Sequence, residues 1–414
     1  ETFDPNLWSA YRISSEPLEE RKYLVEGLVA PGAPVLFAAD GGVGKSFLSL
    51  DLGLKIAARE PGEELTWLGE KITDDIPPGG SVVLFTAEDT RAEINRRLSG
   101  IGDEYLKREG AKNFYVFALP DLGGAFHMLS SQPGGSNTVV NPVWNSWLSW
   151  MRGLDELSLV IIDPIAPFLH DDESKMNVIN DFYQRVVPPI CGEMGAALMM
   201  THHIRKTGGK VESADEMRDA IRGSNAIVNN LRCVVGVWND PDDRRTLAAL
   251  KREYKRDQAY KAAVLKSNNP DSFSHTKNLV RSDKGILEDQ TIKIRDGNVE
   301  NRKWIVAAIK LSAEDGYPFT RTGSSSMFQR KRELPEQLQT MTRRSLESMV
   351  DYAIDQKEVI PAGQGTSWLD VPDGAVASGA RKGAKKSRPT SELIDWSLYE
   401  IDRLRGDTVQ RKTS

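Results

Sequence analysis

The stretch Val35-Leu36-Phe37-Ala38-Ala39-Asp40-Gly41-Gly42-Val43-Gly44-Lys45-Ser46 decides the fold. An apolar run that is typical of a buried strand enters a glycine-rich turn, and an amphipathic helix pattern follows. The turn ends in Gly-Lys-Ser, which is the arrangement of a P-loop, with Ala39 in place of the usual first glycine. Glycines let the backbone curl so that several amide N–H groups point toward one phosphate chain, and the helix adds its positive N-terminal dipole.

The P-loop predicts ATP and Mg²⁺ as ligands. The Lys45 side chain can reach the β- and γ-phosphates, and the Ser46 hydroxyl can bind the metal ion. A glycine-rich strand-to-helix turn without a ligand is the alternative, and it is disfavoured because both flanking elements are present. The residues that we expect to contact the nucleotide are Asp40, Gly41, Gly42, Val43, Gly44, Lys45 and Ser46.

A second apolar strand pattern ends in a carboxylate. Residues 158–162 read Ser-Leu-Val-Ile-Ile, and Asp163 follows them. In a parallel sheet the tip of this strand would bring Asp163 beside the P-loop, where it could hold Mg²⁺ directly or through water. Buried strands often end in aspartate, so this signal is weak alone and gains its weight from the P-loop.

A third apolar strand, residues 82–87, is followed by Glu88 and Asp89. Ligand-facing residues of an α/β sheet lie just beyond the carboxyl ends of its strands. Glu88 is therefore the preferred general base, which would orient and deprotonate the water that attacks the γ-phosphate. Asp89 is expected to cap the helix that follows.

A fourth strand pattern, residues 195–201, ends in the pair His202 and His203. A pair of histidines at this place predicts a γ-phosphate sensor, because an imidazole can hydrogen-bond the phosphate and transmit its loss to the next loop. That loop, residues 205–220, is charged and contains glycine. Contact with a nucleic-acid backbone and simple solvation of a surface loop are equally compatible with its basic residues, Arg205, Lys206 and Lys210.

Bulk composition narrows the class of protein. The chain has 414 residues, 39% hydrophobic and 27% charged, which is ordinary for a globular protein of two or three domains. No apolar run approaches the ~20 residues that span a bilayer, so no membrane association is expected. The net charge of −5 excludes a simple polyanion binder. The two cysteines, Cys191 and Cys233, lie in apolar surroundings and indicate buried free thiols in a reducing cytoplasm.

Strand-like and helix-like patterns alternate through the first 295 residues. This alternation predicts an α/β fold with a mainly parallel sheet and helical crossovers. The expected strands are 35–39, 81–87, 114–118, 158–162, 195–201, 233–238, 262–266, 278–282 and 286–293, and the expected helices are 45–59, 90–99, 143–154, 175–187 and 216–229.

The remaining patterns divide the chain into five parts. Residues 1–30 form a polar N-terminal segment, which we expect to pack on a neighbouring subunit, and 31–295 form the ATPase motor. Residues 302–372 read as helices followed by a short hairpin, which describes a small winged-helix-like domain. Residues 373–390 are predicted to be a flexible basic linker, and 391–406 a C-terminal amphipathic helix.

The order of these motifs resembles that of the RepA-like hexameric helicases, which are RecA-fold P-loop ATPases of plasmids and phages. The resemblance covers roughly residues 20–295. Besides the P-loop, it rests on Phe85-Thr86-Ala87-Glu88-Asp89, Val160-Ile161-Ile162-Asp163-Pro164, His202-His203-Ile204-Arg205-Lys206, Arg222-Gly223-Ser224-Asn225-Ala226 and Ala263-Val264-Leu265-Lys266-Ser267-Asn268.

The resemblance implies a ring, most simply a hexamer, with ATP between identical subunits and single-stranded DNA threaded through the pore. It implies replication of a plasmid, phage or mobile element, and it leaves room for a primase or replication initiator as partner. Arg222 matches the family's Arg-Gly-Ser context and is the first candidate for a positive group donated to the neighbouring subunit's phosphates. Local capping or pairing of Arg222 is about equally compatible with the sequence, and Arg232 and Lys266 are the other candidates.

Two other functions stay open at the level of sequence. The chain could be a RecA-like recombination or repair ATPase that forms filaments on DNA. It could instead be an ATP-switched DNA-binding regulator, in which the winged-helix-like domain reads a specific sequence. Unwinding of a forked duplex separates a helicase from both of these.

Overall fold

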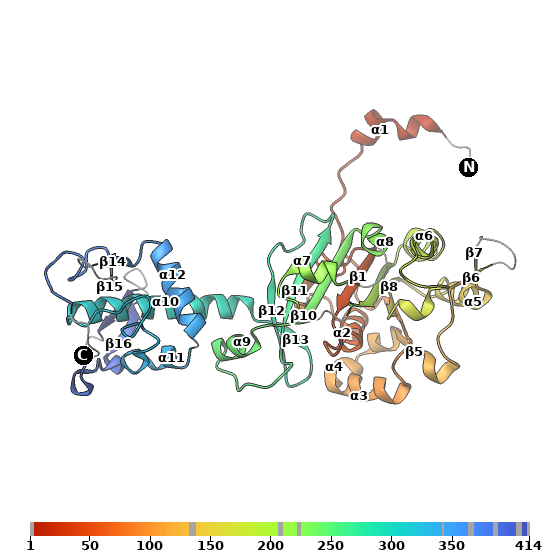
Figure 1. Ribbon diagram of the computed structural model, residues 1–414. Helices are drawn as coiled ribbons and strands as arrows, with labels where there is room; N and C mark the ends of the chain where they lie inside the picture. Colours follow the sequence, from red (N-terminus) through yellow and green to blue (C-terminus); the bar gives the residue numbers. More distant parts are fainter. Residues whose placement is uncertain are drawn as a thin grey trace. The chain divides into compact units, whose positions relative to one another are not determined.

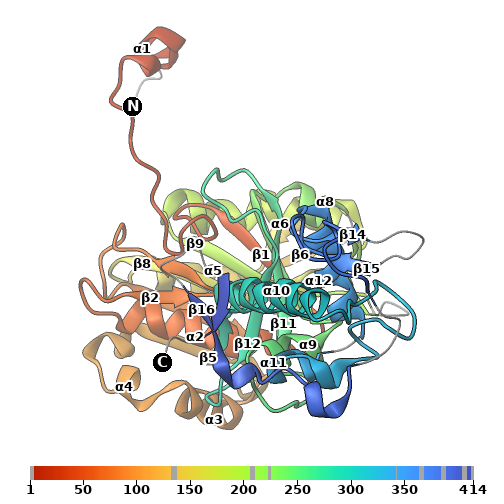
Figure 2. The same ribbon diagram turned by 90° about the vertical axis from the view of Figure 1, so that its left-hand side faces the viewer.

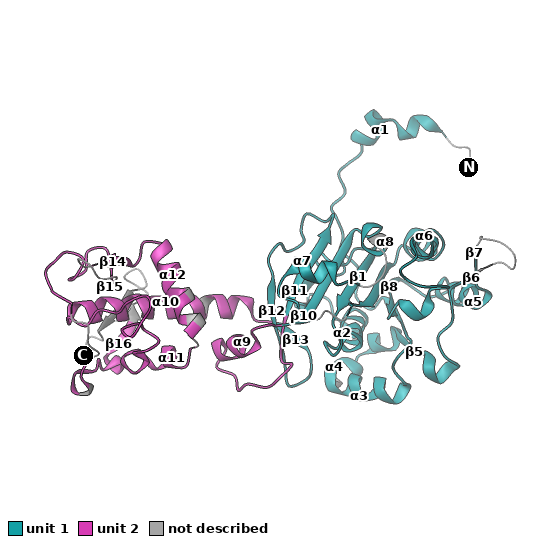
Figure 3. Cartoon of the chain, viewed as in Figure 1, with its two compact units in different colours: residues 1–239, 261–288 teal, residues 240–260, 289–414 magenta. Residues whose placement is uncertain are grey.

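The computed structural model describes residues 4–131, 138–205, 210–221, 225–341, 343–362, 368–383, 388–402 and 408–411. The chain divides into two compact units (Figure 3). Unit 1 contains residues 1–239 and 261–288, and unit 2 contains residues 240–260 and 289–414. Each unit is therefore built from two stretches of chain, and the N-terminal segment belongs to unit 1.

Unit 1 is built on one large sheet. Its order, in the part of the chain that the structure describes, is β13-β12-β11-β10-β1-β9-β8-β4-β5. The strands are β1 (Pro34–Ala39), β4 (Ser81–Thr86), β5 (Phe114–Ala118), β8 (Leu157–Asp163), β9 (Ala197–His203), β10 (Cys233–Asn239), β11 (Ala259–Ser267), β12 (Lys277–Arg281) and β13 (Leu287–Asp289).

The centre of the sheet is parallel. Strand β1 pairs in parallel with both β9 and β10, while β8 pairs in parallel with β9 and β4. One strand, β9, thus separates the P-loop strand from the strand that ends in Asp163. In the register Ala39 lies opposite His203 and Thr86 lies opposite Asp163, so the ends of four strands meet at one edge. The prediction of an α/β fold with a mainly parallel sheet is confirmed.

Helices cover both faces of this sheet (Figures 1 and 2). Because side chains alternate along a strand, each buried strand serves two apolar layers. One layer gathers α5 and α6 on the sheet through Trp144 and Phe182, which are fully buried. Helix α2 packs against β4 and β8. The helices are α1 (Ala10–Ser14), α2 (Lys45–Ala58), α3 (Arg91–Ile101), α4 (Asp103–Leu106), α5 (Pro142–Met151), α6 (Met176–Arg185), α7 (Ala214–Asp219) and α8 (Asn225–Asn229).

Two short hairpins occupy the loops that interrupt the alternation. Strands β2 (Leu65–Trp67) and β3 (Glu70–Ile72) pair antiparallel, as do β6 (Leu129–Ser131) and β7 (Thr138–Val140). Neither hairpin is among the strands expected from the sequence, because strands of three residues leave too little periodicity to detect. Within the described residues, none of the helices has the length and apolar character needed to cross a bilayer.

Unit 2 is a second, smaller core. Its elements are α9 (Asp243–Ala249), α10 (Thr291–Glu314), α11 (Glu336–Gln339), α12 (Arg343–Asp355), β14 (Ile360–Ala362), β15 (Trp368–Asp370), β16 (Tyr399–Asp402) and β17 (Thr408–Arg411). Ile305 and Ala308 of α10 pack with Leu346 of α12 and with Phe319. Strands β14 and β15 form an antiparallel hairpin after α12, as the sequence indicates, and the assignment to the winged-helix class stays a prediction.

The predicted C-terminal helix over 391–406 is wrong. Residues 396–398 form a single turn of 3₁₀ helix, and the chain then continues as β16, which pairs antiparallel with β17. Tertiary contacts decide this outcome, because Trp396 stacks edge-on against Trp304 and its indole N–H donates to the Glu333 carbonyl at 3.0 Å. Trp396 and Tyr399 pack against the core of unit 2, whereas Leu393 and Leu398 are exposed.

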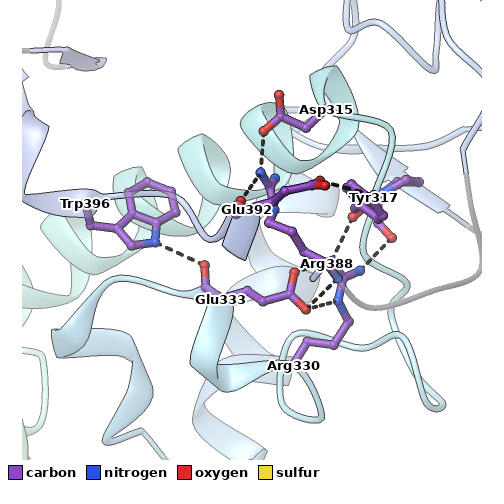
Figure 4. A network of polar contacts seen from close by, with 8 residues as sticks. Asp315, Tyr317, Arg330, Glu333, Arg388, Glu392 and Trp396 are labelled. Carbon is purple, nitrogen blue, oxygen red and sulfur yellow. Dashed lines mark hydrogen bonds and ion pairs between the residues drawn. The ribbon is translucent and has the colours of Figure 1, made fainter. Parts of the chain in front are cut away.

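The predicted flexible linker over 373–390 is also wrong at its end. The Arg388 side chain is only 4% exposed and donates to Asp315 at 2.5 Å (Figure 4). Its backbone N–H donates to Glu333, and its guanidinium lies over the Tyr317 ring. The small polar residues around Arg388 in the sequence predict a solvated side chain. In the structure the side chain is buried between the Asp315 carboxylate and the Tyr317 ring. Lys385 and Lys386 lie outside the described residues.

The N-terminal segment carries large apolar side chains that unit 1 does not cover. Trp8 is 69% exposed and Tyr11 is 85% exposed. Helix α1 has five residues and no buried side chain. Packing of residues 1–30 on a neighbouring subunit stays a prediction.

Candidate active site

The P-loop joins β1 to α2 as the sequence predicts. The loop turns through Gly42 and Gly44, whose φ angles of +81° and +88° lie in the left-handed region that favours glycine. A Cβ placed on Gly41 or Gly42 would meet nothing within 4 Å, so the loop has open space over these residues. Gly44 caps α2 without a side-chain bond, which leaves the first amide groups of the helix available to an anion.

Lys45 lies at the base of this loop. Its ammonium donates to the carbonyl of Ala39 at 3.1 Å and to that of Asp40 at 3.2 Å. The side chain is buried, and burial lowers the pKa of the amine, while the charges of Asp163, Glu88 and Asp40 oppose that shift. A cation enclosed by three acidic residues at the mouth of a P-loop is well placed to bind phosphate oxygens.

Asp163 ends β8 and is 1% exposed. The Thr201 hydroxyl donates to its Oδ1, while its Oδ2 is buried and has no hydrogen-bond partner within the described part of the chain. Burial raises the pKa of this carboxyl, and the nearby charges of Glu88 and Asp89 raise it further. A carboxylate with an unsatisfied oxygen in an acidic surrounding fits a divalent cation.

The donor set around Asp163 suits Mg²⁺ rather than a metal caged by protein alone. Ser46, the second residue of α2, lies beside Asp163 and Asp89, and its hydroxyl opposes the rise in the pKa of both carboxyls. Among the described residues, no group of three or more His, Cys, Asp or Glu side chains could hold a metal ion. Ser46 and Asp163 would therefore hold Mg²⁺ together with phosphate oxygens and water.

Glu88 and His203 come together at the same edge of the sheet. The Glu88 Oε1 lies 3.2 Å from the His203 Nε2, and both side chains are partly open to solvent. The backbone supports this placement, because the Ala87 N–H donates to the Asp163 carbonyl at 2.9 Å. The candidate base thus has a ring nitrogen within hydrogen-bond distance that can orient it.

The two histidines are separated by the pleat of β9. His202 is 1% exposed, and its Nδ1 lies 3.9 Å from the Glu173 Oε2. Neighbouring side chains on a strand point to opposite faces, so only one of the pair can reach the P-loop edge. The structure places His203 beside Glu88 and does not bring His202 into that cluster, although the sequence could not choose between them.

Asp89 does not cap α3 as expected. The cap is Thr90, whose hydroxyl accepts from the Glu93 N–H at 3.3 Å. Asp89 instead accepts from the Arg97 guanidinium at 2.6 Å, and burial raises the pKa of its carboxyl while Arg97 opposes the shift. Sequence reasoning missed Arg97, because two helical turns separate it from its partner and no local pattern marks the pair.

The basic residues after β9 are only partly described. Arg205 is exposed and lines a cavity of about 600 Å³ together with Asp215 and Arg218. Lys210 is exposed too, whereas Lys206 and Arg222 lie outside the described residues. Lys266, an alternative candidate for the positive group given to a neighbouring subunit, donates within its own chain to the carbonyls of residues 228 and 229 at 3.1 and 2.7 Å.

The chain is similar to known proteins in two respects. A family model described as an AAA domain matches residues 1–209, which is half of the chain. Among solved structures, the chain is similar to a KaiC-like protein from the hyperthermophilic archaeon Pyrococcus horikoshii OT3, with 13% identity and a TM-score of 0.40 over 65% of this chain and 99% of that one. No curated protein matches.

Proposed function

The chain belongs to the AAA-domain family, and from this premise we propose that it is an ATP-driven DNA helicase that works as a ring of identical subunits. The family and the P-loop together make it a nucleotide-dependent ATPase. The observation that carries the proposal is the Glu88–His203 contact of 3.2 Å at the P-loop edge. This contact joins a candidate base to the strand that leads directly into the basic loop.

The chain's own residues divide the work of binding. The loop amides and Lys45 hold the phosphates, and Ser46 and Asp163 hold the metal ion. Mg²⁺, when bound, supplies charge neutralisation on the phosphate oxygens. Asp89 is fixed by Arg97 at 2.6 Å and lies beside Ser46 at the edge of this site.

Glu88 performs the proton transfer. Its carboxylate accepts a proton from the attacking water as the water oxygen bonds to the γ-phosphorus and the bond to the bridging oxygen breaks. The products are ADP and inorganic phosphate. His203 orients the Glu88 carboxylate and senses when the phosphate leaves.

The link from ATP to DNA runs along β9. His203 is the last residue of this strand, and Arg205 follows two residues later. The Arg205 N–H donates to the Ala220 carbonyl at 2.7 Å, which ties the two ends of the 205–220 loop together. We propose that Arg205, Lys206 and Lys210 contact the phosphodiester backbone of single-stranded DNA, and that Arg222 stabilises charge in the neighbouring subunit's site.

The test measures ATP hydrolysis and strand separation with the full chain. Lys45→Ala should abolish ATP binding, and Glu88→Gln should keep binding but lower turnover by about 10²–10⁴-fold, because it removes the general base. Lys107→Ala and Glu64→Gln change the same residue types at exposed positions and should behave as the wild type. Full hydrolysis by Glu88→Gln would refute the base assignment.

The helicase proposal has its own readout. The wild type should unwind a forked duplex, and electron microscopy with single-stranded DNA and a non-hydrolysable nucleotide should show closed rings. Filaments without unwinding would favour the recombination ATPase instead. Protection of one defined DNA sequence, with slow hydrolysis and no unwinding, would favour the regulator.

A further inference from the structure

A hairpin turn that the motif analysis did not single out lies against the P-loop. Strands β12 and β13 are joined by residues 282–286, and the turn is closed by backbone bonds between Ser282 and both Gly285 and Ile286. Gly285 has a φ of +85°, and a Cβ there would come within 3.2 Å of the Phe47 ring in the first turn of α2. This turn therefore rests on the helix that begins in the P-loop.

Arg281, the last residue of β12, joins the turn to the loop. Its Nη1 donates to the Gly285 carbonyl at 3.1 Å, and its Nη2 donates to the Val43 carbonyl at 2.9 Å. A guanidinium presents its donors in a rigid planar fork, so one side chain can hold two carbonyls in fixed relation. Val43 is fully buried, and it lies between the two glycines of positive φ.

The orientation of the Val43 carbonyl matters for phosphate binding. A P-loop points its amide N–H groups inward, so its carbonyls point outward and need partners of their own. The Val43 carbonyl and the Gly44 N–H belong to one peptide plane. Gly44 imposes little steric resistance to rotation of this plane, and rotation would turn its N–H away from the phosphates. A bond from Arg281 opposes that rotation.

The Arg281 guanidinium also lies close to the backbone of Gly44. A Cβ on Gly44 would lie 3.3 Å from the Arg281 Nη1, so a larger residue at 44 would push the guanidinium away. The glycine is thus required both by its own backbone angle and by the approach of this side chain.

We propose that Arg281 is a positioning residue for the nucleotide phosphates, acting through the Val43 carbonyl to hold the Gly44 N–H toward the ligand. This inference deepens the proposed ATPase function and rests on it. The β12–β13 turn becomes part of the nucleotide site, although it lies far from the P-loop in the sequence and carries no known motif.

The experiment compares three variants of the full chain. Arg281→Gln removes the charge and the fork, Arg281→Lys keeps the charge but can reach one carbonyl at a time, and Lys284→Ala removes a charge from the same turn without touching the P-loop. Lys284 is 58% exposed and lies 3.7 Å from Glu104 at the surface. Equilibrium dissociation constants for Mg-ATP and Mg-ADP, kcat for hydrolysis and the thermal midpoint are measured for each.

Arg281→Gln should raise both dissociation constants by about tenfold or more, the loss expected for one hydrogen bond from a charged donor. At saturating ATP its kcat should stay within about threefold of the wild type, because Glu88 is not altered. Arg281→Lys should give an intermediate loss, and Lys284→Ala should match the wild type.

Two outcomes would overturn the inference. The first is unchanged dissociation constants in Arg281→Gln, and a lower thermal midpoint in the same variant would then indicate a merely structural role. If Arg281→Gln fails to fold, wild-type affinity in Arg281→Lys would overturn it as well. A wild type that binds no nucleotide would refute the proposed function itself, and this failure is seen before any variant is made.

Discussion

Replacing the buried Glu333 by glutamine should destabilise unit 2 far more than the same replacement at an exposed glutamate. Glu333 and Arg330 form an ion pair whose side chains are 5% and 1% exposed. The Arg330 Nε donates to the Glu333 Oε1 at 2.7 Å, and its Nη2 donates to the other carboxylate oxygen (Figure 4). Both carboxylate oxygens are therefore used by one guanidinium inside the protein.

Glutamine has the same shape but cannot satisfy this arrangement. Its NH₂ group would face the N–H donors of Arg330, and the arginine would remain charged and buried. Arg330 keeps its bonds to the carbonyls of residues 317 and 318, both at 3.0 Å, but at residue 333 it finds one neutral acceptor in place of a bidentate carboxylate. Removing one partner of a buried ion pair costs about 3–5 kcal/mol. The Arg388 backbone N–H, which donates to the same carboxylate at 3.3 Å, is weakened as well.

Hydrogen exchange read by mass spectrometry is the suitable assay, because it reports on each unit of a two-unit chain separately. Peptides within 315–341 and 388–402 should exchange faster in Glu333→Gln, while peptides of β1 and β8 should be unchanged. Glu336→Gln, an exposed position three residues on, is the matched control. A decrease of less than about 1 kcal/mol in the free energy of unfolding of unit 2 would refute this reasoning, because it would show that Arg330 is not left as a buried charge without a counter-ion.

Three further predictions concern unit 1. Cys191 and Cys233 should react with a thiol reagent at pH 8 only after unfolding, because burial raises the pKa of each to about 12 and leaves a thiolate fraction of about 10⁻⁴. Glu63→Gln should lower the free energy of unfolding by about 0.5–1 kcal/mol at pH 7, since the Arg108 guanidinium holds the pKa of Glu63 below its usual range. That difference should vanish in acid denaturation curves as the pH falls through the lowered pKa, because the carboxylate is then protonated in both states. His203→Ala should lower the rate constant of ATP hydrolysis in single-turnover experiments, while the affinity for ATP stays within about threefold of the wild type. An unchanged rate constant would show that the contact between His203 and Glu88 does not contribute to hydrolysis.

The parallel sheet could be predicted because its strands are buried on both faces. Such strands are continuous apolar runs, and β1 and β4 were predicted within one residue of their observed bounds. The P-loop, Glu88 and Asp163 could be placed for the same reason, since each follows such a run and parallel strands end at a common edge.

The errors lie where distant contacts override the local pattern. The sequence patterns place a domain boundary between residues 295 and 302, yet α10 runs across it without interruption for 24 residues, Thr291–Glu314. Contacts of α10 with α9 and α12 stabilise the helix through this region, although Gly297 lowers its intrinsic helix propensity. Arg281 is a similar case, because the carbonyl to which it donates, that of Val43, lies 238 residues away in the sequence.

The same kind of distant contact decided the C-terminal segment. Tyr399 and Ile401 alternate with Glu400 and Asp402, which is a strand pattern, but it was outweighed by helical spacing over a longer window. Pairing with residues 408–411 settles the choice, and no short window contains that information.

The division of the chain has a practical consequence for dissecting it. The polypeptide passes between the two units at residues 239–240, 260–261 and 288–289, so one protease cut cannot release either of them. A protein shortened after residue 288 would still carry α9, stripped of the α10 surface against which it rests, and would tend to aggregate through it. Excising residues 240–260 with a short glycine bridge, together with everything beyond 288, is the way to obtain an isolated motor.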